Sequence, residues 1–296
     1  MLEALLNNEP TIYAFLYFGI FGVVAIWEGF APRRALTAPL RTRWLNTMAI
    51  YLADVSVLRL LFPLLGVGVA LATQERGWGL FNVWAAPVWL VPLVSLLAID
   101  AGHYVQHYLL HRFPPLWRIH RMHHTDHDYD FTTGLRFHPL ESVYTTAFDL
   151  SVIVALGVPP LMVIAYEFVY VVISVAVHGN VRVPIALDRV LRIFVVTPDL
   201  HRVHHSAAVR ETDSNFGAVL PWWDRLLGTY VAQPARGHEG MEIGLPEFRD
   251  HKHLTLWWML VNPFLSVPNQ AERTHSVEST EASPMSWNET AKIREG

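Results

Sequence analysis

Long apolar stretches alternate with short polar segments over the first part of the chain. The stretch TIYAFLYFGIFGVVAIWEGF (11–30) holds a single charged residue, Glu28, close to its end. A helix crosses the hydrocarbon core of a bilayer with roughly 20 mainly apolar residues. The other apolar runs cover about 47–72, 83–106, 143–157 and 160–178. This pattern predicts an all-α integral membrane protein with four to five transmembrane or re-entrant helices.

The last two apolar runs are separated by residues 157–160, GVPP, a sequence that breaks a helix. We therefore expect these runs to form a hairpin that leaves one side of the membrane and returns to it. The first run of the pair is short for a full crossing, so a re-entrant hairpin is an open alternative.

Four arginines follow the first apolar run, between residues 33 and 43. Cytoplasmic loops carry an excess of basic residues, which places this segment in the cytoplasm. Counting crossings from there puts the chain beyond about residue 107, and again beyond 179, on the cytoplasmic side. That side is the inner face of the inner membrane if the protein is bacterial. We expect a helical cap there.

The domain organisation follows from the change in polarity along the chain. Residues 1–268 are expected to form a single membrane-embedded domain, in which a histidine-rich core covers about 95–232. Residues 269–296 are polar and lack hydrophobic periodicity, which predicts a disordered C-terminal tail.

Composition narrows the candidate functions. Hydrophobic residues make up 52% of the chain and charged residues only 16%, whereas soluble domains average about 25% charged residues. The net charge of −4 and the scattered arginines argue against binding to nucleic acid. Because the chain has no cysteine, disulfides, thiolate-bound zinc and iron–sulfur clusters are excluded. Any metal must be held by nitrogen and oxygen ligands.

Histidines gather in one part of the sequence, with twelve of the 16 between residues 103 and 205. The segments HRMHH (120–124) and HRVHH (201–205) share one spacing. Positions i, i+3 and i+4 of a helix lie on one face, so each segment is expected to present its three imidazoles together. Nine imidazoles are predicted to meet near the cytoplasmic interface: His107, His111, His120, His123, His124, His178, His201, His204 and His205.

The number of imidazoles indicates more than one metal ion. Imidazole suits iron, zinc, copper and nickel, and a four-coordinate zinc site uses at most four protein ligands. Nine are too many for one ion and about right for two. A thiolate-free pair of metals beside an apolar membrane interior indicates dioxygen chemistry on a lipid. An unactivated C–H bond requires a strong oxidant, which side chains alone cannot supply and a metal pair with O2 can.

Three segments in order, DAGHYVQHYLLHR, LWRIHRMHH and TPDLHRVHHS, resemble the histidine boxes of the fatty acid hydroxylase superfamily, in its sterol desaturase-like branch. LRFHPLE, HGN and DSNFGAVLPWWDRLLGTY are further matches. The resemblance implies a membrane-embedded, O2-dependent di-iron hydroxylase or desaturase, and it implies that the nine histidines named above hold two Fe ions. Tyr108 stands where the family often has Arg, and His103 where an aromatic or apolar residue is usual.

Three carboxylates are candidates for holding the metal-bound imidazoles in place. Metal-bound imidazoles commonly donate their second N–H to a carboxylate, and Asp100, Asp199 or Asp224 could accept it. A helix cap or a pair with Arg is the alternative for each. Asn180 could hold a metal-bound water or cap a turn.

Two histidines stand next to the predicted ligand set. His103 lies one helical turn before His107 and could join the metal shell or pack nearby. His138 lies in RFHPLE, where Arg136 and Glu141 could pair and leave the imidazole as a structural hydrogen-bonding group.

The leading interpretation is oxidation of a membrane lipid, with hydroxylation and desaturation both open. Sterol, hopanoid, carotenoid, fatty acyl and ether lipid substrates all remain possible, as does any oligomeric state. Since the chain lacks flavin, dinucleotide and haem motifs, electrons are expected from an external ferredoxin or a cytochrome b5-like donor. A zinc-dependent membrane hydrolase is an alternative, although its HExxH motif is absent. A metal transporter or store would instead place histidines along the spans.

Overall fold

The computed structural model describes residues 2–267, with side chains described from residue 8 onward except at residue 10. Within this range the chain is helical, apart from turns and two isolated antiparallel bridges, Pro32 with Val181 and Ser206 with Ile243. The all-α fold predicted from the hydrophobic pattern is therefore confirmed. The predicted tail, 269–296, lies outside the described residues.

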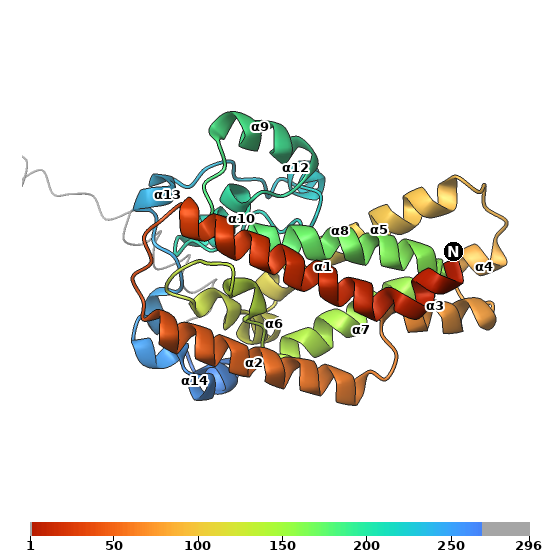
Figure 1. Cartoon of the computed structure of the whole chain (residues 1–296), viewed down its shortest axis with the longest axis horizontal. Coiled ribbons are helices and arrows are strands. Elements are labelled where there is room, and N and C mark those ends of the chain that lie inside the picture. The colour runs from red at the N-terminus through yellow and green to blue at the C-terminus, as the bar shows by residue number, and fades with distance from the viewer. Residues whose placement is uncertain (1, 268–296) are drawn as a thin grey trace, which may run out of the picture. The chain divides into compact units, whose positions relative to one another are not determined.

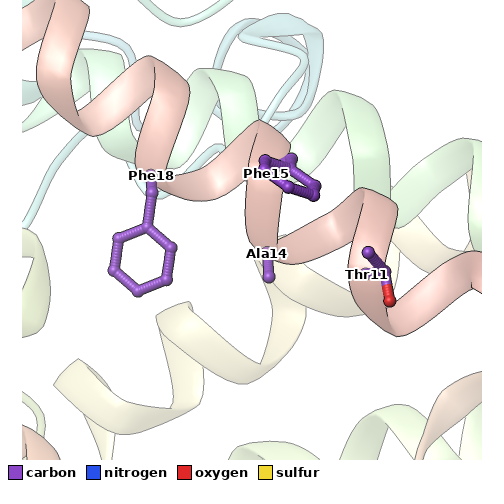
Figure 2. A pocket seen from close by; sticks show the side chains of 4 residues that line it. All are labelled: Thr11, Ala14, Phe15 and Phe18. Atoms are coloured by element: carbon purple, nitrogen blue, oxygen red, sulfur yellow. The ribbon is translucent and has the colours of Figure 1, made fainter.

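Four stretches are long and apolar enough to cross a membrane: Thr11–Phe30, Leu40–Val83, Pro139–Leu156 and Pro160–Val177. They belong to helices α1 (Leu2–Phe30), α2 (Leu40–Leu61) with the segment that follows it to Val83, α7 (Pro139–Leu156) and α8 (Pro160–Val177). These helices are those expected of an integral membrane protein. The outer face of α1 is apolar, and Thr11, Ala14, Phe15 and Phe18 line a shallow pocket on it (Figure 2). Because one helix supplies all four residues, we interpret this pocket as lipid-facing surface.

The predicted single span 47–72 is wrong in one respect, because the helix breaks within it. Helix α2 ends at Leu61 and α3 (Gly66–Glu75) begins after a short linker. Pro63 has no N–H for a helical hydrogen bond and disfavours the helical conformation at the preceding residue. Phe62 accordingly has φ −119° and ψ 88°. A short helix, α4 (Leu80–Val83), follows α3.

The predicted hairpin at residues 157–160 is present. Helix α7 ends at Gly157 in the left-handed conformation, with φ 69°, and α8 starts with Pro160 in its first turn. Glycine is the usual residue for the first role and proline for the second. Gly79, with φ 87°, packs its backbone directly against Gly157, so that a Cβ atom at residue 79 would overlap the backbone of α7. The glycine pair joins the start of α4 to this turn.

Helix α5 (Leu90–Arg112) begins later than the predicted span 83–106 and extends beyond it. It is not among the four described stretches that are long and apolar enough to cross a membrane, so this predicted span is not supported. Helix α5 packs against α7 and α8. A hydrophobic cluster that includes Ala70, Ile99, Ile153, Val163 and Tyr166 joins α3, α5, α7 and α8. A second cluster, which includes Val24 and Val171, joins α1 to α8, and these two helices run side by side in Figure 1.

Short helices form a cap at one end of the bundle, where α5 and α8 end and α2 and α7 begin (Figure 1). The cap consists of α6 (Pro114–His120), η1 (His123–Thr125), η2 (Thr133–Leu135), α9 (Ile185–Phe194), α10 (Pro198–His204), α11 (Val209–Thr212), α12 (Trp222–Leu227), α13 (Gly237–Gly240), η3 (Pro246–Phe248), η4 (His251–Leu254), α14 (Leu256–Val261) and η5 (Asn262–Phe264). It contains or adjoins every histidine of the two repeated segments.

Candidate metal centre

The nine predicted histidines come together in two groups. In each group the potential ligand atoms all lie within 4.8 Å of one another. The first group consists of His107, His111, His120, His124 and His204, and the second of His123, His178, His201 and His205. The imidazoles come from α5, the α6–η1 segment, the residue after α8, and the α10 segment. Segments up to about a hundred residues apart in sequence thus supply one compact set of nitrogen donors.

The spacing of the two repeated segments predicts that each presents its three imidazoles together, and this prediction is wrong. HRMHH sends His120 and His124 to the first group and His123 to the second. Helix α6 ends at His120, and His123 belongs to a separate 3-10 turn, so the three imidazoles are not on one continuous helix face. HRVHH is divided as well, with His204 in the first group and His201 and His205 in the second. Both segments therefore contribute to both groups.

Six of the nine imidazoles hold Nδ1 against an oxygen outside the cluster. The pairs are His107 with Phe216 O (3.0 Å), His111 with Asp213 Oδ1 (3.2 Å), His120 with Glu141 Oε1 (2.6 Å), His123 with Arg136 O (3.2 Å), His178 with Ser174 O (2.7 Å) and His204 with Ser214 O (2.8 Å). A carbonyl oxygen only accepts, so Nδ1 carries the proton in His107, His123, His178 and His204. The lone pair of Nε2 is then available to a metal.

The inward nitrogens have the spacing expected of ligands to one ion. In the first group, Nε2 of His120 and Nε2 of His124 lie 3.0 Å apart. In the second group, Nε2 of His178 lies 3.2 Å from Nε2 of His201 and 3.4 Å from Nε2 of His123. Two neighbouring ligands at a metal–nitrogen distance of about 2.1 Å are about 3.0 Å apart when they meet the metal at a right angle.

Buried nitrogens of the cluster also lack partners within the described chain. Nε2 of His204 and Nε2 of His205 are buried and have no hydrogen-bond partner among the described residues. Burying a polar group without a partner is costly. The donor set thus fits two metal ions, one in each group.

Burial keeps these imidazoles neutral. Removal from water lowers the pKa of His120 to about 3 and that of His178 to about 4. The pKa values of His123, His204 and His205 fall well below the ordinary value, because burial and neighbouring imidazoles both oppose protonation. A neutral imidazole is the form that binds a metal.

Two carboxylates contact the histidine cluster directly, and sequence reasoning did not assign either of them this role. Glu141 holds His120, and Asp213 holds His111. The predicted pair of Arg136 with Glu141 is not formed, because Arg136 instead donates to Thr125 Oγ1 (3.1 Å) and lies 3.7 Å from Asp126. Both carboxylates stand in the family-like segments LRFHPLE and DSNF, which was the available signal.

The three predicted carboxylates have other partners. Asp100 accepts from Tyr166 Oη (2.9 Å), Trp223 Nε1 (2.7 Å) and two backbone N–H groups of the 219–220 segment. Asp199 pairs with Arg202 and Arg33. Asp224 accepts from the backbone N–H groups of residues 216 and 217 and from Thr229. These carboxylates fix the backbone around the cluster. Asp224 accepts from the N–H of Phe216, and the carbonyl of Phe216 contacts His107, so Asp224 is linked to His107 through this one residue.

The remaining candidates stand outside the two groups. Asn180 exchanges hydrogen bonds with the backbone of Arg34, accepting at 2.9 Å and donating at 2.7 Å. His103 lies 3.3 Å from Asp149 and packs against aromatic rings of α8. His138 caps α7 by accepting from Leu140 N (3.1 Å). In each case the contact is with a residue outside the two histidine groups.

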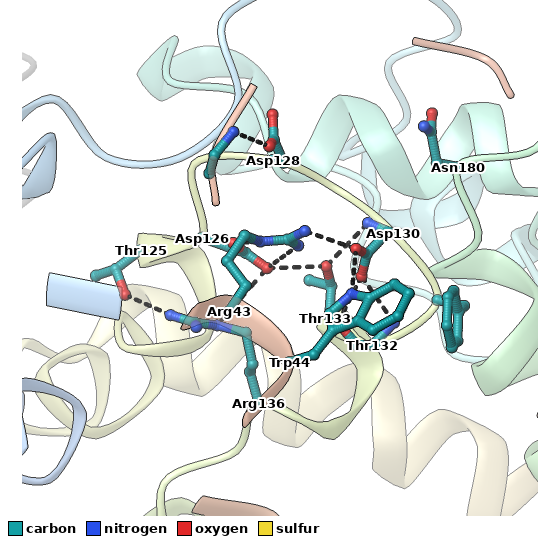
Figure 3. Close-up of polar contacts among 12 residues, drawn as sticks. Arg43, Trp44, Thr125, Asp126, Asp128, Asp130, Thr132, Thr133, Arg136 and Asn180 are labelled. Carbon is teal, nitrogen blue, oxygen red and sulfur yellow. Dashed lines mark hydrogen bonds and ion pairs between the residues drawn. The ribbon is translucent and has the colours of Figure 1, made fainter. Parts of the chain in front are cut away.

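A buried ionic network holds the loop that follows HRMHH against α2 (Figure 3). Arg43 donates two hydrogen bonds to Asp126, both at 2.8 Å, and one to Asp130 at 2.6 Å. All three side chains are almost completely buried. Paired geometry of this kind stabilises the carboxylate, and it holds the pKa of Asp126 far below its usual range. Sequence reasoning identified Arg43 only as one of the arginines that orient the membrane spans.

A helical membrane bundle that gathers nine imidazoles into two metal-sized groups defines a narrow class of protein. Residues 92–229 match the family model described as fatty acid hydroxylase. This region, just under half of the chain, carries all nine histidines and is similar to the fatty acid hydroxylase family.

Three proteins with known names are similar to part of the chain. Ornithine lipid hydroxylase OlsE of Rhizobium tropici is 32% identical over 48% of this chain and 42% of its own length. Human alkylglycerol monooxygenase is 31% identical over 62% of this chain and 41% of its own length. Human cholesterol 25-hydroxylase is 28% identical over 49% of this chain and 53% of its own length. The chain thus spans about half or less of each relative. No solved structure matches it significantly.

Proposed function

We propose that this protein is a di-iron oxidoreductase that uses O2 to hydroxylate a C–H bond of a membrane lipid. The observation that carries the proposal is the division of nine buried imidazoles into groups of five and four, with Nδ1 of six of them bonded to oxygens outside the cluster. The relatives that act on ornithine lipid, alkylglycerol and cholesterol favour hydroxylation over desaturation.

Each histidine group would hold one iron ion. Bound iron would supply the activation of O2 that amino acid side chains cannot provide. The chain's own residues would fix the geometry: Glu141 and Asp213 orient His120 and His111, and backbone carbonyls orient four further imidazoles.

Packing around the cluster would exclude water from the reaction. The ring of Trp117 lies 4.9 Å from that of His111, and the ring of Phe216 lies against His107 and His204 at 5.5 and 5.7 Å, measured between centroids. An apolar surround strengthens the electrostatic effect of each ligand and protects a reactive oxidant from side reactions.

Substrate and electrons would arrive from different phases. The lipid would approach from the bilayer, between α5 and the apolar helices α7 and α8, which end or begin at the cluster. Electrons would come from an external ferredoxin or a cytochrome b5-like protein on the cytoplasmic side, where the positive-inside rule puts the cap.

A zinc hydrolase is less well supported. A catalytic zinc site uses three protein ligands and leaves one position open, whereas each group here offers four or five imidazoles. We expect anaerobically purified protein to carry two irons per chain, one for each histidine group. Elemental mass spectrometry with Mössbauer spectroscopy on iron-57-enriched protein tests this. One zinc and no iron would overturn the proposal in favour of hydrolysis.

Lipid analysis tests the reaction itself. Membranes of a host that expresses the wild-type chain should accumulate a lipid whose mass is raised by one oxygen atom, and the added oxygen should come from 18O2. Host membranes with the His204→Ala variant should lack this product. An iron-loaded wild-type chain that leaves every host lipid class unchanged, with a competent reductant present, would contradict lipid hydroxylation.

A further inference from the structure

Helix α9 presents the opposite arrangement from an amphipathic helix in water. Its two buried residues, Asp188 and Arg192, are only 4% and 7% exposed. They pair with each other across one turn. Asp188 also accepts from Thr197 Oγ1 (2.6 Å), and Arg192 donates to Ala232 O (2.7 Å). The two buried charged side chains of α9 therefore have partners within the protein, although Nε of Arg192 has no hydrogen-bond partner among the described residues.

The outward side of α9 is apolar. Its large exposed side chains are Ile185, Leu187, Val190, Leu191, Ile193 and Phe194. The most exposed of them, Ile185, is 71% accessible. A surface helix of a soluble protein turns its apolar stripe inward and its charges to water. The reversed arrangement indicates that α9 faces an apolar phase.

Helix α12 extends the same surface. Trp222, Leu226 and Leu227 are exposed, with Leu226 at 74%. Trp222 Nε1 donates to Ile193 O at 2.6 Å, which ties α12 to α9. The two helices lie together at the side of the cap in Figure 1. We call the exposed apolar residues of α9 and α12 the α9–α12 patch.

We propose that the α9–α12 patch is embedded in the headgroup region of the bilayer, on the side of the membrane that holds the histidine cluster. The patch is joined to the spanning bundle at two points. Helix α9 follows the spanning helix α8 after the loop 178–184. Tyr104 of α5 forms a hydrogen bond of 2.9 Å with Thr229, two residues beyond Leu227.

The charges around the patch fit a lipid surface. Arg189 is exposed on α9, and Arg225 is exposed on α12. Helices that lie in the membrane interface bury an apolar face and keep Lys or Arg beside it for anionic headgroups. Tryptophan, as at residue 222, is enriched at that depth.

A lipid surface explains the patch better than a soluble redox partner does. Contacts with electron-transfer proteins are small, and non-obligate protein interfaces are no more apolar than the rest of a protein surface. Nine exposed large apolar side chains on two helices exceed that pattern. Such patches otherwise cause aggregation in water.

The inference also sets the depth of the histidine cluster. Thr197, the residue bonded to Asp188 of α9, is the N-cap of α10 and accepts from Leu200 N at 3.3 Å. Helix α10 carries His201 and His204. An interfacial α9 therefore holds the cluster at headgroup level, where a lipid can reach it without leaving the bilayer. This placement depends on the membrane fold and not on the proposed activity.

Site-directed spin labelling tests the proposal, because the chain has no native cysteine. Single Leu187→Cys and Leu226→Cys variants would be labelled and reconstituted at low density into phosphatidylcholine–phosphatidylglycerol nanodiscs. A matched Arg236→Cys variant reports the water-facing part of the cap, because that side chain is 73% exposed and precedes α13. Collision with O2 and with a water-soluble nickel complex gives the depth of each label.

We expect the labels at positions 187 and 226 to lie about 5–10 Å inside the headgroup–acyl boundary, and the label at 236 to lie in water. Equal exposure of all three labels to the nickel complex would overturn the proposal. Spin–spin broadening that protects 187 and 226 would overturn it in favour of a second copy, and protection seen only after a redox partner is added would favour that partner. Unchanged metal content shows that each variant is folded. Because the readout is depth, it succeeds or fails independently of the enzymatic activity.

Discussion

Nδ1 of His120 lies 2.6 Å from Oε1 of Glu141, and both side chains are almost completely buried. The bond connects the end of cap helix α6 with the first turn of the spanning helix α7. It fixes the direction in which Nε2 of His120 points, toward Nε2 of His124. A carboxylate in this position also makes the imidazole a better metal ligand.

The Glu141→Gln variant should therefore bind iron less well. Loss of such a carboxylate typically lowers metal affinity or activity by about 10–100-fold. Metal titration against a competing chelator, together with the yield of oxidised lipid, measures the effect. A surface carboxylate gives the control: Glu239→Gln, on an exposed side chain, should leave iron affinity unchanged. Equal affinity in wild type and Glu141→Gln would show that the bond does not support the metal.

Loss of one ligand from either histidine group should abolish the activity. His204→Ala removes a donor from the first group and His123→Ala one from the second. Oxygen activation by two irons needs both ions, so product formation should stop in either variant. His251, which is exposed on η4, belongs to neither group, and His251→Ala should retain wild-type activity. Equal loss in all three variants, measured as 18O incorporated into lipid, would contradict the ligand assignment.

The buried network around Arg43 should be needed for stability. Arg43→Met leaves Asp130 buried without its cation and leaves Asp126 with only Arg136, 3.7 Å away, and loss of a buried partner typically costs about 3–5 kcal/mol. A lowered midpoint in thermal unfolding of the detergent-solubilised protein measures it. The triple variant Arg43→Met, Asp126→Asn, Asp130→Asn removes the charges together and should recover part of the loss. A triple variant less stable than the single one would show that the carboxylates, rather than their pairing, stabilise the loop.

The contact between Gly79 and Gly157 should tolerate no side chain. In Gly79→Ala, both the left-handed backbone, with φ 87°, and the overlap with the backbone of α7 oppose folding. Gly77 is the matched control, because it also has a positive φ, of 65°, but a Cβ atom there meets nothing within 4 Å. A non-glycine residue in this region costs of order 1–3 kcal/mol. Gly79→Ala should thus lower the thermal midpoint more than Gly77→Ala does, and equal shifts would rule out the overlap.

The sequence by itself determined the helical membrane class and the identity of the histidines. In lipid, the backbone N–H and C=O groups of an apolar run of spanning length must be paired within the protein, and a helix pairs them. The GVPP break correctly predicted the α7–α8 hairpin. Apolar runs and the GVPP break are properties of neighbouring residues, which is why the sequence pattern captures them. The break at Pro63, which divides α2 from α3, was not predicted although a single residue causes it.

Tertiary structure decided how the histidines are shared and which oxygens hold them. His120 and His123 lie in one five-residue segment but belong to different groups, because α6 ends between them and the chain turns. Asp213 reaches His111 across 102 residues of sequence. The apolar outward face of α9 follows from the buried partners of Asp188 and Arg192 rather than from its hydrophobicity alone. Such contacts depend on how helices pack, and no local spacing rule encodes them.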